Sequence, residues 1–222
     1  MELVIFDCDG VLVNSEAIYI AAEMDFLESA GLSYTRRDYV KTYTGMQPNA
    51  WRLKLAAEAQ KRRCKPLEEG FFEALDQYVM ARFKADLTAI SGVRESVSSL
   101  ELKRCVASSS SIERLHWKLE HTGLSDLFMG AVFSSDMVTN GKPEPDLFLH
   151  AASIMDVKPE ECIVIEDSYN GVLAGKAASM TVIGFYGGDH CLEGHDADLM
   201  EAGADQVVDD FANLKLTIDQ LS

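Results

Sequence analysis

Short runs of apolar residues recur along the chain and predict buried strands. The runs are LVIF at 3–6, CVA at 105–107, AVF at 131–133, CIVI at 162–165, TVIGF at 181–185 and QVV at 206–208. Continuous apolar runs of this length are typical of strands that are covered on both faces of a sheet. Helical spacing of apolar residues lies between most of them, at 111–123, 145–155 and 169–178. Strands that alternate with helices predict a parallel sheet with helices on both faces, which is a Rossmann-like α/β fold.

One long segment, residues 15–87, departs from this alternation. Its apolar positions have helical spacing at 16–30, 49–61 and 67–83, and it contains no convincing strand pattern. We interpret it as an all-helical cap domain inserted after the first strand, with residues 1–14 and 88–222 forming the Rossmann-like core. An insertion at this point leaves the sheet at the carboxyl ends of its strands, where open α/β sheets bind ligands.

Composition and charge narrow the possible partners. The 222 residues are 47% hydrophobic, and 20 basic against 36 acidic residues give a net charge of -16. A surface this acidic repels nucleic acid and acidic membranes. The five cysteines include no CxxC pair, and no apolar run approaches the roughly 20 residues of a membrane span. We therefore expect a cytoplasmic monomer or weak dimer that is neither exported nor membrane-bound and whose partner is a small molecule.

Charged and hydroxyl side chains follow the predicted strands. Asp7 and Asp9 come directly after the first strand, and residues two apart in an extended chain point the same way. The other such residues are the SSSS run at 108–111, Lys142, Glu166 and Asp167. Because the carboxyl ends of parallel strands meet at one edge, these side chains are expected to gather there. Carboxylates beside a lysine and hydroxyls suit Mg²⁺ bound through oxygen next to a phosphate.

Four motifs, in order along the chain, resemble those of the haloacid dehalogenase superfamily. They are FDCDGVLVNSE, VASSS, GKPEPDLF and VIEDSYNG. The first and third are similar to the branch that contains β-phosphoglucomutase and small sugar phosphatases. This resemblance implies a Rossmann-like core with a helical cap and a reaction that passes through an aspartyl phosphate.

The resemblance also implies roles for individual residues. Asp7 is expected to be the nucleophile and Asp9 the general acid and then base. Ser108 and Ser109 are expected to bind the phosphoryl oxygens, and Lys142 to neutralise charge on the nucleophile and the phosphate. The implied magnesium ligands are Asp7, the Asp9 carbonyl, Glu166 and Asp167.

Two positions favour a phosphatase over a mutase. Tyr19 and Pro48 stand where β-phosphoglucomutase carries a histidine and a phosphate-gripping arginine. Without a clamp for a second phosphate, the aspartyl phosphate is expected to react with water. Arg52 or Lys54 could supply such a clamp in another geometry, so a phosphohexomutase remains the alternative. A non-catalytic binding module on a phosphatase fold is a further alternative.

The choice of substrate is expected to depend on the cap. We assign specificity to Met46 and Gln47, in a loop that dips toward the active site in relatives, and to Arg52. By analogy with the branch, the substrate is a phosphorylated sugar or sugar acid.

The stretch GGDHCLEGHD places His190, Cys191 and His195 close together in sequence. Their spacing matches no common zinc pattern, and glycine-rich polar stretches are ordinary connections. We interpret this stretch as a loop, with a transition-metal site as the minor alternative.

Overall fold

A computed structural model of the protein describes residues 1–43, 48–63 and 67–221. Its contacts divide the chain into two compact units. The core unit comprises Met1–Asn14 and Thr88–Ser222, and the helical unit comprises Ser15–Leu87. None of the helices within the described ranges is both long and apolar enough to cross a membrane.

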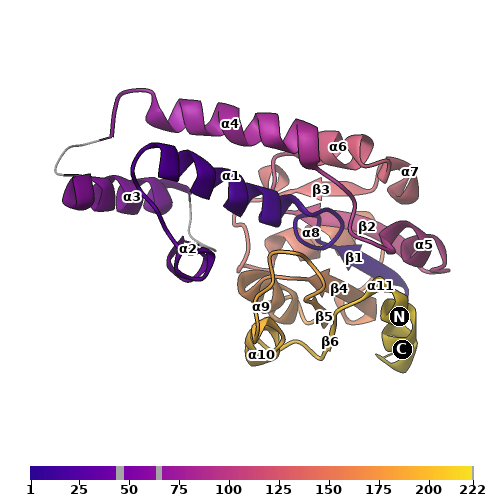
Figure 1. Ribbon diagram of the computed structural model, residues 1–222. Coiled ribbons are helices and arrows are strands. Elements are labelled where there is room, and N and C mark those ends of the chain that lie inside the picture. Colours follow the sequence, from indigo (N-terminus) through magenta and orange to yellow (C-terminus); the bar gives the residue numbers. More distant parts are fainter. Residues whose placement is uncertain (44–47, 64–66, 222) are drawn as a thin grey trace. The chain divides into compact units, whose positions relative to one another are not determined.

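The core unit is built on one sheet of six parallel strands in the order β3-β2-β1-β4-β5-β6 (Figure 1). The strands are β1 (Leu3–Phe6), β2 (Lys103–Ser108), β3 (Val132–Ser134), β4 (Cys162–Glu166), β5 (Thr181–Phe185) and β6 (Gln206–Val208). Ile5 of β1 pairs with Cys105 on one side and Val164 on the other. The predicted parallel sheet is therefore confirmed, and its order reverses direction at β1, the first strand in the chain.

Helices cover both faces of this sheet. They are α5 (Val93–Ser98), α6 (Ile112–His121), α7 (Ser125–Phe128), α8 (Asp146–Ile154), α9 (Tyr169–Ala177), α10 (His195–Glu201) and α11 (Phe211–Leu221), with short 3-10 turns at Ser135–Met137 and Pro159–Glu161. Leu3 and Ile5 pack with Phe148 of α8 in the core of one face. On the other face, the ring of Phe6 makes an edge contact with Phe128 of α7 at 6.0 Å. The alternation along β1 thus supplies both apolar layers.

β2 begins two residues before its predicted start, with Lys103 and Arg104. The Arg104 guanidinium donates hydrogen bonds to the carbonyls of Leu127, Val97 and Leu100. A charged residue can therefore occupy this strand because the ends of neighbouring helices supply acceptors, which an apolar pattern does not reveal.

The helical unit contains α1 (Ser15–Ser29), α2 (Arg36–Tyr43), α3 (Pro48–Arg63) and α4 (Phe71–Asp86). The sequence predicted three of these helices and missed α2, whose sequence RRDYVKTY is mostly polar. α2 forms because Thr35 accepts a hydrogen bond from the Asp38 backbone N–H at 3.1 Å, and because Tyr39 and Tyr43, one turn apart, are buried. The core of this unit consists of Ile20, Leu27, Leu32, Tyr39, Tyr43, Leu55 and Ala59.

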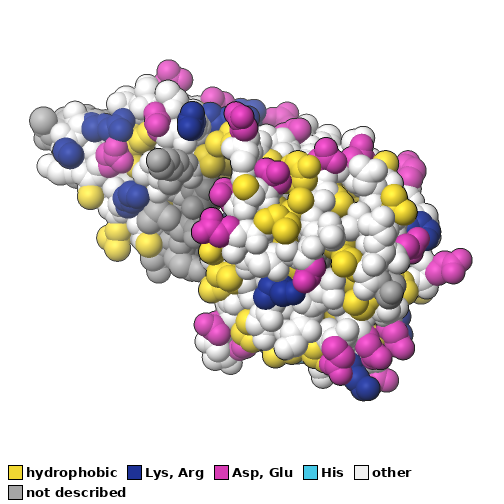
Figure 2. Space-filling model, turned by 90° about the horizontal axis from the view of Figure 1, so that it is seen from below, with side chains coloured by type: hydrophobic (Ala, Val, Ile, Leu, Met, Phe, Trp, Pro, Cys, Tyr) yellow, Lys and Arg dark blue, Asp and Glu magenta, His cyan; other side chains and the backbone are white. Residues whose placement is uncertain are grey.

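The two units differ in charge. Residues 15–87 hold 11 basic and 11 acidic residues, so the net charge of -16 belongs entirely to the rest of the chain. Acidic side chains are spread over the face of the molecule that Figure 2 shows. The core unit is therefore a strongly acidic body joined to a neutral one.

Candidate active site

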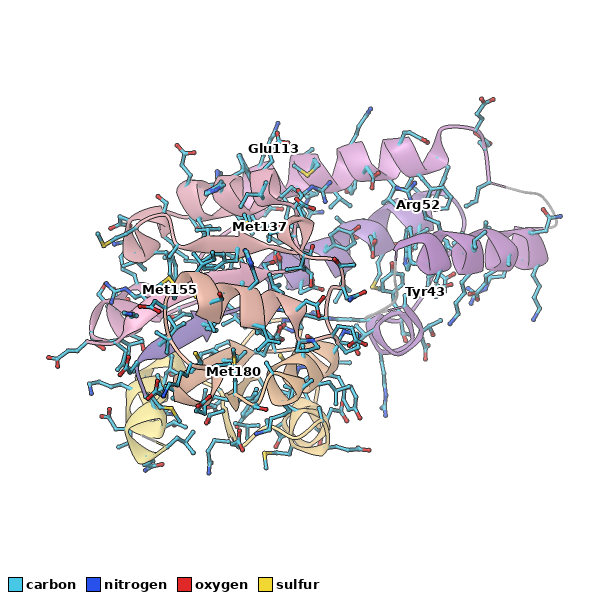
Figure 3. All side chains as sticks on the ribbon, turned by 180° about the vertical axis from the view of Figure 1, so that it is seen from behind. Tyr43, Arg52, Glu113, Met137, Met155 and Met180 are labelled. Atoms are coloured by element: carbon cyan, nitrogen blue, oxygen red, sulfur yellow. The ribbon has the colours of Figure 1, made fainter. Side chains whose placement is uncertain are left out.

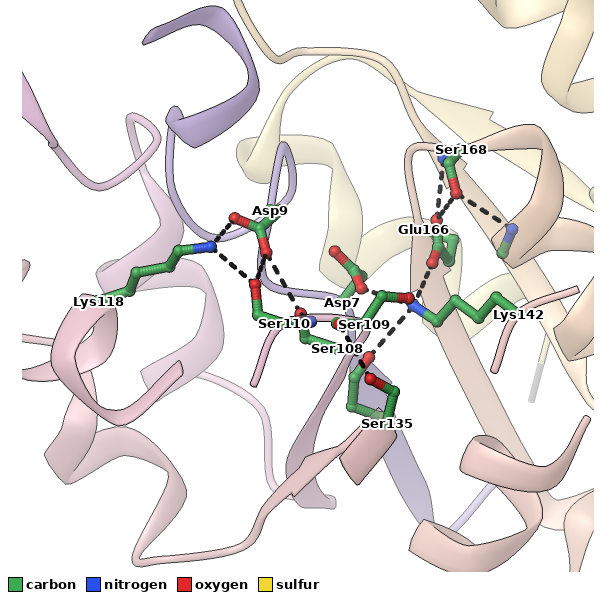
Figure 4. Close-up of polar contacts among 12 residues, drawn as sticks. Asp7, Asp9, Ser108, Ser109, Ser110, Lys118, Ser135, Lys142, Glu166 and Ser168 are labelled. Carbon is green, nitrogen blue, oxygen red and sulfur yellow. Dashed lines mark hydrogen bonds and ion pairs between the residues drawn. The ribbon is translucent and has the colours of Figure 1, made fainter. Parts of the chain in front are cut away.

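Asp7 follows β1 directly and lies at the centre of a buried polar cluster (Figure 4). Its backbone N–H donates to the Ile165 carbonyl at 2.9 Å, which continues the pairing of β1 with β4. Its side chain is only 7% exposed, and Lys142 Nζ donates to Asp7 Oδ1 at 2.6 Å and to Glu166 Oε1 at 2.5 Å. The lysine therefore bridges carboxylates at the ends of two neighbouring strands, one directly after β1 and one at the last residue of β4.

Burial and the neighbouring charges together shift the pKa of Asp7. Burial raises the pKa of the Asp7 carboxyl well above its usual value, and the nearby Glu166 and Asp167 raise it further, while Lys142 opposes them. For Lys142 itself, burial lowers the pKa, but the attraction of Asp7 and Glu166 outweighs burial and raises it. One lysine thus faces several carboxylates, and an additional cation would favour the ionised form of Asp7.

Asp9 has a different set of partners. Ser110 Oγ donates to Asp9 Oδ2 at 2.8 Å, and Ser108 Oγ donates to the same oxygen at 3.3 Å. The ammonium of Lys118, which comes from α6, donates to Asp9 Oδ1 and to Ser110 Oγ. The lysine side chain is 7% exposed, so Asp9 is held by a buried cation of its own.

The sequence did not predict Lys118 as a site residue. A signal was present: on α6 the lysine shares a helix face with the buried Leu115 and Leu119, where a charged side chain needs a partner. That partner is Asp9, 109 positions earlier in the chain.

Hydrogen bonds from residues at the end of β3 hold the serine run at 108–111 in place. Ser110 N donates to Ser108 Oγ at 3.1 Å, Ser134 Oγ donates to the Ser110 carbonyl at 2.7 Å, and Ser135 Oγ donates to the Ser109 carbonyl at 2.9 Å. These hydrogen bonds hold the run in a compact turn beside Asp9.

Glu166 and Asp167 are packed against glycines that no larger residue could replace. Glu166 Oε2 accepts from the Ser168 backbone N–H and hydroxyl, both at 2.9 Å. A Cβ at Gly171 would overlap the Glu166 carboxylate, and a Cβ at Gly10, whose φ is +80°, would overlap the Asp167 carboxylate. The chain thus approaches both carboxylates closely enough that only glycine fits.

Asp167 is also bound by two histidines from the segment that follows β5. His190 Nε2 lies 2.8 Å from Asp167 Oδ2, and His195 Nε2 donates to the Asp167 carbonyl at 2.6 Å. Burial lowers the pKa of His190, but its hydrogen bond to Asp167 outweighs burial and raises it to about 11. The sequence interpretation of this stretch as a simple loop missed these contacts with a site residue.

The structure brings together the site residues that the sequence placed in the core: Asp7, Asp9, Ser108, Ser109, Lys142, Glu166 and Asp167. Arg52 lies in the helical unit (Figure 3). It pairs with Asp76 at 3.1 Å, and its guanidinium lies 5.2 Å from the Phe72 ring centre. Met46 and Gln47 lie outside the described residues.

The donor set at the sheet edge fits a hard divalent cation. Asp7, Glu166 and Asp167 supply carboxylate oxygens, and these three groups interact strongly enough to perturb the pKa of Asp7. Oxygen is the donor that Mg²⁺ prefers, and the buried negative charge here exceeds what Lys142 supplies. The glycines at positions 10 and 171 leave room for the carboxylates at this edge.

Comparison with known proteins agrees with this geometry. The sequence profile of the haloacid dehalogenase-like hydrolases matches residues 1–179. The chain is 36% identical over 207 residues to a phosphorylated carbohydrates phosphatase of Thermotoga maritima, covering 92% of both chains. It is 32% identical to the protein SUPPRESSOR OF QUENCHING 1, chloroplastic, of Arabidopsis thaliana, where the match covers 96% of this chain but 20% of that longer protein.

A solved structure is similar over almost the whole chain. It is a hydrolase of the same family from Deinococcus radiodurans with bound phosphate and sodium; the TM-score is 0.84 at 30% identity, with 99% of this chain and 96% of that chain covered. The ordered motifs, the parallel sheet and these matches lead to one conclusion: the chain belongs to the haloacid dehalogenase-like hydrolase family.

Proposed function

We propose that the protein is a phosphatase that hydrolyses a small phosphomonoester through an aspartyl-phosphate intermediate. The observation that carries the proposal is the bridging position of Lys142, whose Nζ lies 2.6 Å from Asp7 Oδ1 and 2.5 Å from Glu166 Oε1 at the end of β4. A buried, cation-paired carboxylate at the carboxyl edge of a parallel sheet is suited to attack an electrophile that carries negative charge. The activities named for the Thermotoga relative support the same reaction class.

Asp7 is the proposed nucleophile. Attack of one of its oxygens on phosphorus forms the Asp7–phosphate bond as the bond to the leaving alcohol breaks. Lys142, already in contact with Asp7, stabilises the negative charge that collects on the phosphoryl oxygens. Ser108 and Ser109, in the turn after β2, are proposed to donate hydrogen bonds to the same oxygens.

Asp9 is the proposed general acid and base. It gives a proton to the leaving alcohol, and then takes a proton from the water that attacks the aspartyl phosphate, which returns Asp7 and releases phosphate. In the structure, Ser110 donates to one oxygen of the Asp9 carboxylate and Lys118 to the other, and these contacts orient it. Lys118 is therefore a positioning residue in this scheme.

Magnesium is the proposed cofactor. Asp7, the Asp9 carbonyl, Glu166 and Asp167 would hold the ion, in agreement with the oxygen donor set at this edge. When bound, the ion supplies positive charge to the phosphoryl oxygens and to the nucleophile. Both oxygens of Glu166 also accept hydrogen bonds, from Lys142 and from Ser168, which fix the orientation of this carboxylate.

The proposed substrate class is phosphorylated sugars or sugar acids, since one relative is named for phosphorylated carbohydrates. The mutase alternative requires a cation that grips a second phosphate. Arg52 pairs with Asp76, and Lys54 Nζ donates to the Thr42 carbonyl at 3.0 Å, so both cations have partners within the helical unit. These contacts favour hydrolysis.

The deciding experiment measures phosphate release from a panel of phosphorylated sugars, sugar acids and p-nitrophenyl phosphate. We expect release that a chelator abolishes and Mg²⁺ restores. Asp9→Asn should slow hydrolysis of alkyl phosphates by about 100-fold or more and that of p-nitrophenyl phosphate far less, because nitrophenolate needs no proton to leave. Equal slowing of both would contradict the role of Asp9. Conversion of β-glucose 1-phosphate to glucose 6-phosphate that outruns phosphate release would favour the mutase.

A further inference from the structure

Three potential metal ligands of the core unit meet beside the proposed active site. His190 and Cys191 lie in the segment after β5, and His195 is the first residue of α10. We call these three residues the Cys–His cluster. One ligand atom from each lies within 4.8 Å of the others. The segment is closely fitted, since a Cβ at Gly188 would lie 2.7 Å from the His190 ring and 2.9 Å from the Gly10 carbonyl.

The hydrogen bond of His195 determines which of its ring nitrogens can bind a metal. His195 Nε2 lies 2.6 Å from the Asp167 carbonyl, and a carbonyl only accepts, so Nε2 carries the hydrogen. In the neutral ring the lone pair is then on Nδ1. Histidines that bind metals usually donate their other N–H to a carbonyl or carboxylate in this way, which fixes the ring and raises its basicity.

His190 and Cys191 lie at a spacing that suits one ion. His190 Nε2 is 3.5 Å from Cys191 Sγ. In a tetrahedral zinc site, with Zn–S near 2.3 Å and Zn–N near 2.0 Å, sulfur and nitrogen are separated by about 3.5 Å. The same Nε2 is 2.8 Å from Asp167 Oδ2, so a carboxylate oxygen adjoins these ligands and is available as a fourth. Cys191 and His195 are only partly buried, which leaves a route from solvent.

We propose that His190, Cys191 and His195 form a binding site for Zn²⁺ or a similar borderline-soft divalent ion, with Asp167 as the fourth ligand. On binding, the Cys191 thiol and His190 Nε2 each release a proton to solvent, and the imidazole that pairs with Asp167 becomes a ligand instead. Zinc therefore takes Asp167 away from the magnesium position and inhibits turnover; this inhibitory part rests on the proposed phosphatase function.

The site is tested first without magnesium or substrate. Chelator-treated full-length protein is titrated with Co²⁺, whose bonds to thiolate give a charge-transfer absorption. We expect one equivalent to bind with this absorption and Zn²⁺ to displace it. Cys191→Ser should abolish the absorption. It should also weaken binding by at least about 100-fold, because loss of a residue that only supports a ligand already costs up to this much, and Cys191 is proposed to be a ligand itself.

Two further variants make this test specific. His195→Gln retains an N–H that can donate to the Asp167 carbonyl but removes the Nδ1 lone pair, so it should also weaken binding. Cys162→Ala removes a buried thiol of β4 and should bind Co²⁺ as the unaltered protein does. A wild-type protein without the thiolate absorption, or a Cys191→Ser variant that keeps it, would overturn the proposal.

The inhibitory part has its own readout. At fixed Mg²⁺, Zn²⁺ should inhibit hydrolysis of p-nitrophenyl phosphate, and Cys191→Ser should require at least about tenfold more zinc for the same inhibition. Additional Mg²⁺ should raise the zinc concentration that inhibits the wild type. Equal inhibition of the two proteins would refute the sharing of Asp167. A protein that binds Co²⁺ but hydrolyses nothing would contradict the phosphatase function and support the metal site.

Discussion

The two units of this protein each bury a carboxyl group, but with different partners. In the acidic core unit, Asp7 is paired with the ammonium of Lys142 at 2.6 Å. In the neutral helical unit, Glu23 lies among aromatic side chains: Tyr39 OH donates to its carboxyl at 2.5 Å, and Trp51 Nε1 donates to Tyr39 OH at 3.3 Å. Burial is the largest influence on Glu23 and raises its pKa to about 8.

The two carboxyls differ in the charge of their partner: Asp7 is paired with an ammonium, whereas Glu23 accepts a hydrogen bond from a neutral phenol. Burial raises the pKa of both carboxyls. At Asp7 a buried cation, Lys142, opposes this rise and so favours the ionised form that a nucleophile requires. At Glu23 no cation is among the main influences, and burial outweighs the hydrogen bond from Tyr39, so the carboxyl is mostly protonated at pH 7. A buried carboxylate is therefore not by itself a mark of catalysis; the charge of its partner distinguishes the two. Four substitutions, from the largest expected effect to the smallest, test this distinction.

Replacing the charged nucleophile should have the largest effect. Asp7→Asn keeps the size and most hydrogen bonds of Asp7 but removes the attacking oxygen, so we expect turnover of p-nitrophenyl phosphate to fall by about 10⁴-fold or more. Asp198→Asn, which changes an exposed carboxylate of α10, should stay near the wild-type rate. Circular dichroism should show both variants folded. Activity of Asp7→Asn close to wild type would exclude the aspartyl phosphate.

Removing the cation tests whether the core pair carries stability. Lys142→Met leaves Asp7 and Glu166 buried without their partner, and we expect the free energy of unfolding to fall by about 3–5 kcal/mol. The control is Lys176→Met, because the pair of Lys176 with Asp205 is 36% exposed on both sides; its loss should cost at most about 1 kcal/mol. Urea unfolding of both variants measures the difference. Equal losses would show that burial does not strengthen the Lys142 pair.

The pH dependence of the helical unit tests the neutral state of Glu23. A carboxyl whose folded pKa is raised binds its proton more tightly in the folded than in the unfolded chain, so its stabilisation is complete below pH 4.5 and is lost as the pH rises to about 8. We expect unfolding of this unit to become easier by roughly 2–4 kcal/mol across this range, and Glu23→Gln to remove most of the slope.

The fluorescence of Trp51 in a Trp117→Phe background reports this unit alone, because the chain has two tryptophans and the other belongs to the core unit. The control is Glu28→Gln, on the exposed face of the same helix α1, which should keep the slope. A pH-independent wild type would mean that Glu23 is already ionised.

The smallest effect on stability is expected for Arg52. Its ion pair with Asp76 is 42% exposed on the arginine side and 50% on the aspartate side, so Arg52→Gln should change the free energy of unfolding by less than about 1 kcal/mol. If the helical unit sets specificity, the same substitution should change the ranking of sugar phosphates by kcat/KM. Arg82→Gln, which removes the ion pairs of an arginine on α4 with Asp25 and Asp86, should leave the ranking unchanged. An unaltered ranking for Arg52→Gln would remove it from the specificity residues.

The parts of the fold that sequence predicted are those with a local cause. β1 and β4 are apolar on both faces, so their sequences alone indicate buried parallel strands. The residues that follow them could be expected at one edge, because parallel strands share a direction. α2 was missed because its stability comes from two tyrosines that pack against other helices, while its own residues are mostly polar.

The parts of the site that sequence missed depend on contacts between distant segments. Lys118 is recognisable as a site residue only once α6 is placed beside Asp9. His190 and His195 contact Asp167 across more than 20 positions, through a turn of the chain that no periodicity specifies. A motif shows which residues can do the chemistry, whereas their supporting partners come from the tertiary structure.

The junction between the two units has a consequence for how the chain folds. The Asn14 N–H donates to the Thr88 carbonyl at 3.1 Å, so the inserted segment leaves and returns through neighbouring backbone. If the helical segment is unfolded, pairing β1 with β2 closes a loop of about 100 residues, which costs conformational entropy. Because this cost grows only with the logarithm of loop length, the insertion adds only about 1 kcal/mol to it. If the helical segment folds first, α1 and α4 hold its ends together and the remaining loop is short. The helical unit therefore adds little to the entropic cost of pairing β1 with β2.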